Sequence, residues 1–454
     1  MPLDSSHSGL LADLYELTMA AGYFETRFEG RATFELFART LPARRNFLVA
    51  AGLDQALEFL ESVHFRAEEI AYLRQHPAFA GIGAGFFDYL ASFRFSGDVL
   101  AMPEGTLCFP GEPLLRVTAP IAEAQIVETA LLATMSFQTM IASKAARVVE
   151  ASAGRPVIEF GARRAHGIES GVLAARAAYI GGCLGTSNVQ AGRSFGIPTY
   201  GTQAHSWIMA HEDEEDAFAR FLNVFPRHSV LLLDTYDVRK ALEKIIAMGR
   251  KPRGVRLDSG DVSADSRWVR QRLDEVGWGD VEIFISGDLD EDRIVSLLAS
   301  GARVDTFGVG TALSTSADAP SLGMLYKLVE VDRHGQVRSA AKLSAAKVTY
   351  PGRKQVYRTL DAAGRFAGDV IALESEHVAG AEPLLAPVMV AGERVSAAAP
   401  LAEAQKRCRA EVERLPGALR GLAVAQPPYP VRYSASLEGL LDQVRERIAR
   451  VSTS

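Results

Sequence analysis

The sequence predicts an α/β fold for the middle of the chain. Between residues 155 and 330, short apolar runs alternate with segments of helical periodicity, and glycine, hydroxyl or charged residues follow each apolar run. Such alternation is typical of β-α-β units that share one parallel sheet. Periodicity does not show whether the sheet closes, so we expect either an incomplete or irregular barrel or an open, doubly wound sheet.

The composition is that of a folded protein of ordinary hydrophobicity. The 454 residues are 48% hydrophobic and 23% charged, with 49 Lys and Arg against 55 Asp and Glu. The formal charge of -6 gives no support for a nucleic-acid or membrane partner. Three widely spaced cysteines favour a reducing, cytoplasmic setting, as do the lack of a basic-then-apolar leader and of an apolar run of ~20 residues.

The first third of the chain, residues 1–154, is predicted to form a separate α+β domain. Residues 10–24 carry apolar side chains at helical spacing, and the pattern alone favours Tyr15 as a core aromatic of an amphipathic helix. The other expected elements are a strand at 33–41, a helix at 52–63, short strands within 97–120 and a long helix at 121–153.

Six strands are expected in the central segment, residues 155–330. Because the carboxyl ends of parallel strands meet at one edge of a sheet, the polar residues that follow these strands should converge there. The strands are expected at residues 156–160, 197–200, 229–233, 254–257, 281–285 and 304–309.

His205 follows the second of these strands, shortly after a break at Gly201. A position at the ligand-binding edge favours a chemical role, and Thr202 and Ser206 would lie nearby. Taken alone, His205 could equally cap the next helix with its ring hydrogen-bonded. The polar turns that follow the other strands favour the chemical role.

The remaining turns bring charges and glycines to the same edge. Arg163 and Arg256 offer planar donors that suit phosphate or carboxylate oxygens, and glycine turns leading into helices bind phosphates. Asp258 and Asp288 suit ribose hydroxyls or hydrated Mg²⁺. Each residue alone has a plainer explanation, such as Asp258 capping a helix or Arg163 lying in a solvated charge run. Jointly they predict a phosphorylated sugar ligand.

The last segment, residues 331–454, gives a weaker signal. Short strands and turns are expected first, followed by helices at 401–415 and 437–451. No catalytic constellation stands out in this segment, so we expect it to pack on the N-terminal domain or on a dimer partner.

Seven motifs, in order along the chain, resemble those of nicotinate phosphoribosyltransferases, which belong to the type II phosphoribosyltransferase family. They extend over most of the chain between Asp13 and Arg358. The motifs are DLYELTM (13–19), EFGARRAHG (159–167), GTSNVQAGRSFGIPTYGTQAHSW (185–207), GVRLDSGD (254–261), SGDLDE (286–291), DTFGVGT (305–311) and KVTYPGRKQVYR (347–358).

The resemblance implies an irregular TIM-like α/β barrel with an N-terminal α+β domain and a C-terminal extension, acting as a homodimer. Members join nicotinate to 5-phosphoribosyl 1-diphosphate, which gives nicotinate mononucleotide and diphosphate. The reaction is an entry step of NAD biosynthesis and is coupled to ATP hydrolysis, in the manner of a ligase. ATP as a co-substrate and Mg²⁺ as a cofactor are therefore implied, while the Mg²⁺ ligands are left open.

The resemblance also assigns roles to individual residues. His205 matches the histidine that is phosphorylated from ATP, and Arg256 and Asp258 match the other catalytic positions. For the pyridine, the expected binding residues are Tyr15 (from the other subunit) and Phe160 on the two faces of the ring, with Ser187 and Thr202 near its substituent. For the phosphorylated sugar, Arg163 is expected at the phosphates and Asp288 near the ribose and its metal. The 5-phosphate is expected at Gly287, Gly310 and Thr311.

Two alternatives are kept. Nicotinamide phosphoribosyltransferases resemble the chain in fold and in several motifs, but they have an acidic residue where this chain has Ser187. A carboxylate there would accept a hydrogen bond from an amide and repel nicotinate, so Ser187 favours the acid as substrate. The other alternative is a non-catalytic sugar-phosphate-binding barrel, which would have no need of a phosphorylatable His205.

Overall fold

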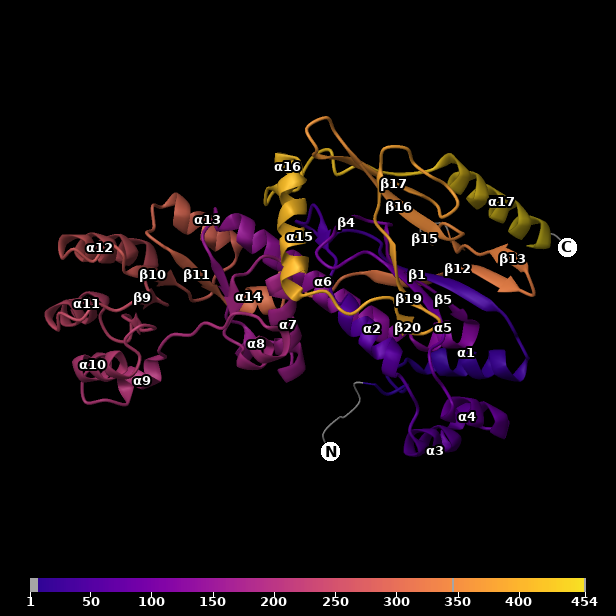
Figure 1. Cartoon of the computed structure of the whole chain (residues 1–454), viewed down its shortest axis with the longest axis horizontal. Coiled ribbons are helices and arrows are strands. Elements are labelled where there is room, and N and C mark those ends of the chain that lie inside the picture. Colours follow the sequence, from indigo (N-terminus) through magenta and orange to yellow (C-terminus); the bar gives the residue numbers. More distant parts are fainter. Residues whose placement is uncertain (1–6, 345–346, 453–454) are drawn as a thin grey trace. The chain divides into compact units, whose positions relative to one another are not determined.

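The computed structural model describes residues 7–344 and 347–452, which form two compact units (Figure 1). Unit 1 comprises residues 1–139, 321–419 and 423–454, and unit 2 comprises residues 140–320 and 420–422. The division at residues 154 and 330, made from the sequence, stays a prediction. The prediction that the chain lacks a leader refers in part to residues 1–6, which lie outside the described residues.

Unit 1 is built around a seven-stranded antiparallel sheet in the order β13-β12-β1-β5-β3-β19-β20. Strand β1 pairs with β12 on one side and β5 on the other, so strands from both ends of the chain complete one sheet. The bounds are β1 Arg31–Ala38, β3 Asp98–Ala101, β5 Pro113–Pro120, β12 Met324–Arg333, β13 Gln336–Ser339, β19 Ala386–Val390 and β20 Glu393–Arg394.

Smaller strands and a set of helices complete unit 1. The further strands are β2 Leu48–Val49, β4 Leu107–Cys108, β14 Leu343–Ser344, β15 Lys347–Val348, β16 Lys354–Leu360, β17 Phe366–Leu373, β18 Glu382–Pro383 and β21 Val431–Tyr433. The helices are α1 Leu14–Glu25, α2 Leu53–Ser62, α3 Ala67–Gln75, the 3-10 helix Pro77–Phe79, α4 Ala84–Ala91, α5 Ile121–Ile126, α15 Leu401–Arg414 and α17 Ala435–Ser452. Helices α6 Glu128–Ala151 and α16 Gly417–Arg420 cross the unit boundaries.

Two helix predictions need correction. The helix expected from residue 10 begins at Leu14, because Asp13 has extended backbone angles and occupies the N-cap position. The single helix expected at 121–153 is two helices, α5 and α6, separated at Val127. Val127 keeps right-handed helical angles, so the apolar periodicity continues across the interruption and does not reveal it.

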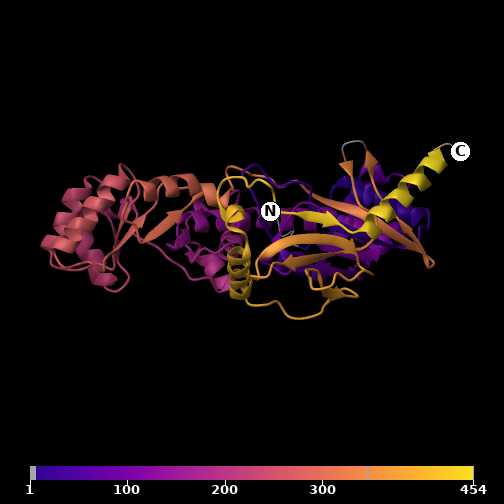
Figure 2. The ribbon, with the colours of Figure 1, turned by 90° about the horizontal axis from the view of Figure 1, so that it is seen from above.

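Unit 2 contains six parallel strands in the order β7-β6-β11-β10-β9-β8, and its helices lie around them (Figures 1 and 2). A parallel bridge from Thr186 to Thr199 continues the sheet beyond β7. Between Thr199 and β8, the side-chain oxygen of Gln203 accepts the N–H of Leu232 at 3.3 Å. No complete ring of paired strands forms within the described residues, which agrees with the expected irregular barrel.

The elements of unit 2 alternate as the sequence predicts. The strands are β6 Val157–Glu159, β7 Gly185–Thr186, β8 Val230–Leu232, β9 Gly254–Leu257, β10 Glu282–Ile285 and β11 Thr306–Val309. The helices are the 3-10 helix Ala162–Arg164, α7 Ile168–Ile180, α8 Val189–Phe195, α9 His205–Met209, α10 Glu214–Val224, α11 Val238–Ala247, α12 Val262–Glu275, α13 Glu291–Ala299 and α14 Thr311–Ser314.

The strand predicted at residues 197–200 is wrong in extent. Only Thr199 pairs there, as an isolated bridge, and the regular strand of this region is β7. Pro198 has no N–H to donate, which limits a ladder through this segment. Strand β7 was not predicted because Gly185 and Thr186 are too short a run to show periodicity.

Buried apolar side chains form the core that holds the strands of unit 2 in place. The core residues of three adjacent strands are Val255, Leu257, Ile283, Ile285, Phe307 and Val309, all of them fully buried. Acidic N-caps define where several following helices begin; Asp237, for example, accepts the N–H of Lys240 at 2.9 Å. Among the described helices, none combines the length and apolar character needed to cross a bilayer.

Candidate active site

Arg256 on β9 lies at the centre of the candidate site in unit 2. Its Nε donates to Ser286 Oγ at 2.7 Å, and its two terminal nitrogens donate to Thr202 Oγ1 at 2.8 Å and Asp258 Oδ1 at 2.5 Å. The guanidinium carbon lies 5.7 Å from the centre of the Phe160 ring. The side chain remains 14% exposed, so an oriented positive charge lies beside a partly exposed aromatic ring. This arrangement suits a planar ligand that carries a carboxylate.

Asp258 directly follows β9. The Ser286 hydroxyl, which accepts from Arg256, donates to Asp258 Oδ1 at 2.5 Å. Burial alone would raise the pKa of Asp258, but the hydrogen bond from Ser286 and the charge of Arg256 outweigh it and lower the pKa. Its second oxygen lies 3.9 Å from His205 Nε2. Asp258 is therefore an ionised carboxylate between an arginine and a histidine.

His205 is the first residue of α9, and its ring is held by contacts outside that helix. Nδ1 lies 3.2 Å from Thr235 Oγ1, and the side chain is 42% exposed. The N-cap of α9 is Ala204, and no side chain caps the helix. If Nδ1 carries the proton and donates to Thr235, the lone pair of Nε2 is available on the side of Asp258.

Phe160 provides a flat apolar surface directly after β6. Its ring packs against the buried side chains of Ile158, Val230 and Phe284, and it remains partly exposed. A Cβ at Gly308 on the neighbouring strand would lie 2.6 Å from the Phe160 ring. A glycine at position 308 is therefore needed for the ring to lie over β11.

The turn after β10 exposes backbone N–H groups. Gly287 has φ +90°, and a Cβ at this position would lie 1.8 Å from the carbonyl oxygen of Asp258, so only glycine fits. Asp288 follows with φ +46°, also in the left-handed region. Within the described residues, neither N–H group has a hydrogen-bond partner. Such consecutive N–H groups form a concave site for an anion.

A second glycine turn follows β11, where Gly310 is the N-cap of α14 and Thr311 is its first residue. The N–H groups at the start of a helix have no partner within the helix. A Cβ at Gly161 would lie 2.3 Å from Ser314 Oγ, so a small residue there lets the turn after β6 approach α14 closely. The turns after β6, β10 and β11 thus lie at one edge of the sheet.

Ser187 and Arg163 are exposed, as is Asp288 of the same predicted set. The N–H of Ser187 donates to the Glu159 carbonyl at 2.9 Å, which fixes its backbone. Thr186 donates to the buried Glu159 carboxylate at 2.6 Å, which ties the ends of β6 and β7 together. In the described part of the chain, the Arg163 guanidinium makes no hydrogen bond or ion pair, so it can bind an anionic ligand.

Three residues outside the predicted set contribute to the site: Ser286 and Thr235, described above, and Asp234. Asp234 Oδ2 accepts the Asp258 N–H at 3.1 Å and the Ser259 hydroxyl at 2.5 Å. Its Oδ1 is buried and has no partner among the described residues. Ser286 directly follows β10, and Asp234 and Thr235 come two and three residues after β8, so the rule that selected Asp258 would have found them.

Tyr15 belongs to unit 1, on α1, and its side chain is exposed. Partial burial and the neighbouring carboxylate of Glu128, to which its hydroxyl hydrogen-bonds, raise the pKa of Tyr15. The hydroxyl therefore stays protonated, and the ring is available for stacking. The other predicted site residues all lie in unit 2.

Comparison with known proteins identifies related sequences over most of the chain. A family model described as the nicotinate phosphoribosyltransferase N-terminal domain matches residues 10–136, and one described as the nicotinate phosphoribosyltransferase family matches residues 156–367. Nicotinate phosphoribosyltransferase pncB2 of Mycobacterium tuberculosis is 45% identical, over 96% of this chain and 94% of that protein. Nicotinate phosphoribosyltransferase of Bacillus subtilis is 42% identical, over 81% of this chain and 77% of that protein.

Solved structures show the same fold. The crystal structure of human nicotinic acid phosphoribosyltransferase matches with a TM-score of 0.83 at 29% identity, over 95% of this chain and 99% of that chain. The nicotinate-nucleotide pyrophosphorylase of Pyrococcus furiosus matches with a TM-score of 0.74 at 27% identity, over 91% of this chain and 97% of that chain.

Proposed function

Because the chain belongs to the nicotinate phosphoribosyltransferase family, we propose that it joins nicotinate to 5-phosphoribosyl 1-diphosphate, as an entry step of NAD biosynthesis. The products are nicotinate mononucleotide and diphosphate. The observation that carries this proposal is the oriented guanidinium of Arg256 beside the exposed face of Phe160, at the same sheet edge as the glycine turns. A flat anion needs an aromatic face and a positive charge, and a sugar phosphate needs the N–H groups of glycine turns.

Nicotinate binding follows from the chemistry of these two side chains. The pyridine ring stacks on Phe160, and its carboxylate is attracted to Arg256 and to the Thr202 hydroxyl. Ser187 presents no charge to that carboxylate, whereas an acidic residue would repel it. The acid rather than nicotinamide is therefore the proposed substrate.

The phosphorylated sugar is bound mainly by backbone groups. The N–H groups of Gly287 and Asp288 and those at Gly310 and Thr311 suit the 5-phosphate. Arg163, which makes no contact with a protein acceptor in the described chain, suits the diphosphate.

Bond formation requires positioning more than proton transfer. The pyridine nitrogen attacks the anomeric carbon as the bond to diphosphate breaks, and positive charge develops on the ribose ring. No general base is needed, because this nitrogen carries no proton. Holding the two substrates in line and stabilising the leaving diphosphate, with Arg163 as one cation, supply the acceleration.

Mg²⁺ fits the carboxylates at this edge. Asp234 has a buried oxygen without a partner, and Asp258 is ionised. Within the described residues no three His, Cys, Asp or Glu side chains group as a metal site, so Asp234 and Asp258 would hold the ion together with substrate oxygens. When bound, Mg²⁺ would neutralise the charge of the diphosphate.

We propose further that ATP phosphorylates His205: the imidazole nitrogen bonds to the γ-phosphorus as ADP leaves, and water later hydrolyses the phosphohistidine to release phosphate. An imidazole with its Nδ1 held by Thr235 and its Nε2 accessible is oriented as a nucleophile toward the γ-phosphoryl group. The phosphoryl group would then add negative charge beside Asp258, close to the site proposed for diphosphate. In this proposal, the added charge favours product formation, and ATP hydrolysis is thereby coupled to the transfer reaction.

A homodimer with shared active sites is proposed from α1. Leu14, Tyr15 and Met19 are exposed apolar side chains at helical spacing on this helix. An exposed apolar stripe of this kind suits a protein interface. In the proposed dimer, Tyr15 stacks on the face of nicotinate opposite Phe160 of the partner subunit.

The proposal is tested by assaying the purified protein with nicotinate or nicotinamide and 5-phosphoribosyl 1-diphosphate, with and without ATP. We expect nicotinate mononucleotide as the product, faster with ATP, and for His205→Ala a partial basal rate that ATP no longer stimulates. Faster turnover of nicotinamide would establish the alternative substrate. No transfer to either pyridine would support the non-catalytic alternative.

A further inference from the structure

Unit 1 contains a cavity of about 900 Å³ whose lining residues all belong to this unit. It lies at the C-terminal end of α1 and is bounded by the start of β1, by α4 and by the turn between β12 and β13. Its volume is within the range of small-molecule sites, which is about 300–1,000 Å³.

Four aromatic side chains line this cavity in two pairs. The rings of Phe24 and Tyr89 lie 5.7 Å apart, and those of Tyr23 and Phe28 lie 5.5 Å apart. Phe24 remains 39% exposed, although it is a large apolar side chain. Aromatic faces left accessible in a cavity favour a planar apolar ligand.

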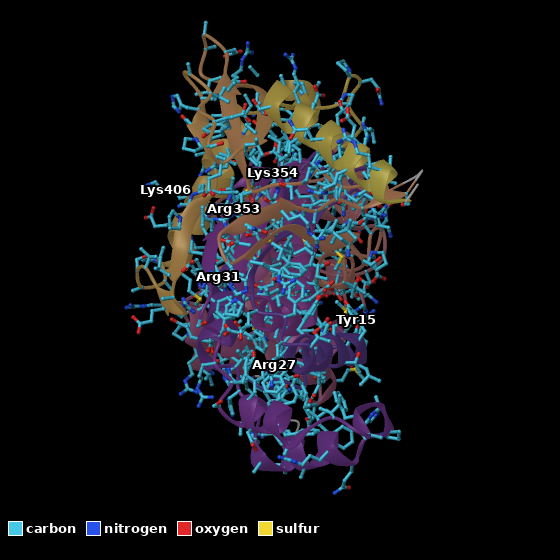
Figure 3. All side chains as sticks on the ribbon, turned by 90° about the vertical axis from the view of Figure 1, so that its right-hand side faces the viewer. Tyr15, Arg27, Arg31, Arg353, Lys354 and Lys406 are labelled. Atoms are coloured by element: carbon cyan, nitrogen blue, oxygen red, sulfur yellow. The ribbon has the colours of Figure 1, made fainter. Side chains whose placement is uncertain are left out.

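The charges of the lining select for a ligand with a single negative charge. Arg31 is already paired with Asp98 at 2.8 Å, whereas the guanidinium of Arg27 has no partner in the described part of the chain (Figure 3). The lining also contains the carboxylates of Glu29 and Asp332. The Arg333 guanidinium already lies over the Phe28 ring, 4.3 Å from its centre. Arg27 is therefore the guanidinium placed to attract one anionic group, while the two carboxylates would repel a polyphosphate.

We infer that this cavity is a binding site for a planar aromatic monoanion, with the ring between the aromatic pairs and the anionic group on Arg27. Nicotinate, proposed for unit 2, is itself an aromatic monoanion, so variants of Arg27 and Phe24 are needed to distinguish binding at this cavity from binding there. Binding at this cavity does not depend on transferase activity, so the two proposals are tested separately.

The test uses the full-length protein and anilinonaphthalene sulfonate, an aromatic monoanion whose fluorescence rises on binding. We expect saturable binding that weakens about tenfold or more in Arg27→Glu and in Phe24→Ala, but only slightly in Arg27→Lys. Lys406→Glu is the matched control, because Lys406 is exposed on α15, outside the cavity, and its reversal changes the net charge equally (Figure 3). Circular dichroism verifies that each variant is folded.

Displacement identifies the chemistry that is recognised. A naphthalene carboxylate should displace the probe, and inorganic diphosphate should not. The proposal is overturned if Arg27→Glu and Phe24→Ala bind the probe as the parent does, or if diphosphate displaces it as well as the carboxylate. It is equally overturned if the parent binds no probe, as would happen if a second copy of the chain covered the cavity.

Discussion

Two arginine–aspartate pairs, one in each unit, show how the same residue types support stability in one place and chemistry in another. In unit 1, Arg358 on β16 donates to Asp369 at 2.7 Å, to Glu411 at 3.0 Å and to the carbonyl of Leu107 at 2.8 Å. Its side chain is 1% exposed, and Asp369 also accepts the hydroxyl of Tyr429. These polar groups bond to one another, and almost none of their surface is open to a ligand.

In unit 2, Arg256 is oriented by an equally short contact to Asp258, but both side chains remain partly exposed. Groups with unused bonding capacity lie around them: the Nε2 of His205, the buried Oδ1 of Asp234 and the N–H groups of the glycine turns. The comparison indicates that unused bonding capacity beside an oriented charge, rather than the ion pair itself, marks the functional site.

The largest expected effect is on stability, in Arg358→Met. Removing the guanidinium leaves the Asp369 carboxylate buried and without its charged partner, which should cost about 3–5 kcal/mol in the free energy of unfolding. Denaturation by urea measures the change. Arg365→Met is the control, because its pair with Asp361 is exposed and should contribute less than about 1 kcal/mol. Equal losses in the two variants would contradict the structural role of Arg358.

The next effect is on rate, in Asp258→Asn. The amide no longer neutralises Arg256 or supplies an anionic oxygen toward a bound metal, so nicotinate transfer should fall about 10²–10³-fold. Asp237→Asn is the matched control, since asparagine caps a helix as well as aspartate does. Initial rates of mononucleotide formation would decide, and a decrease of less than about threefold in Asp258→Asn would contradict the assignment.

A buried carboxylate in unit 1 gives a smaller, pH-dependent effect. Burial raises the pKa of Glu16 to about 7, although a hydrogen bond from Thr129 opposes this shift. The folded state therefore binds the proton more tightly than the unfolded chain, so the contribution of Glu16 to stability is greatest at low pH and is lost as the pH rises toward about 7. Glu16→Gln should remove about 1–3 kcal/mol of this pH dependence.

Urea denaturation of the parent and of Glu16→Gln at about pH 5 and about pH 8 tests the sign of the Glu16 effect. Thr129→Val, which removes the donor but keeps the carboxylate, serves as a comparison. If Glu16→Gln has the same pH dependence as the parent, this carboxylate is not its source.

The smallest expected effect concerns the choice of substrate. Ser187→Asp should lower kcat/KM for nicotinate relative to nicotinamide by about tenfold or more, because it brings a carboxylate near that of the substrate. Ser187→Asn, which is polar but uncharged, is the control and should change the ratio less. A ratio that is unaffected by Ser187→Asp would mean that the residue lies away from the pyridine substituent.

The sequence predicts the strands of unit 2 well where an apolar run is long enough. Strand β9 has the expected bounds, β10 differs by one residue at one end and β8 by one residue at each end, because buried parallel strands are continuous apolar runs. Strand β7 is missed because two residues carry no periodicity. The pairing of β1 with β12 joins segments nearly 300 residues apart, which no local pattern encodes.

In the site, Thr202 and Asp258 both contact Arg256, which lies within β9. The rule that polar residues after parallel strands converge predicts that Thr202 and Asp258 lie at the same edge. It does not show how their side chains are oriented. The shared hydroxyl of Ser286 and the unused oxygen of Asp234 depend on tertiary packing, and so they emerge only from the structure. Likewise, Arg358 lies in a sequence motif that resembles those of the family, but its buried contacts indicate a role in stability.

The most direct test of the account is Arg256→Gln, with the rate of nicotinate mononucleotide formation and the urea midpoint of unfolding measured on the same preparation. We expect the rate to fall about 10²–10³-fold while the midpoint remains close to that of the parent. A rate within about threefold of the parent, or a loss of activity that follows unfolding, would contradict the claim that Arg256 serves chemistry rather than stability.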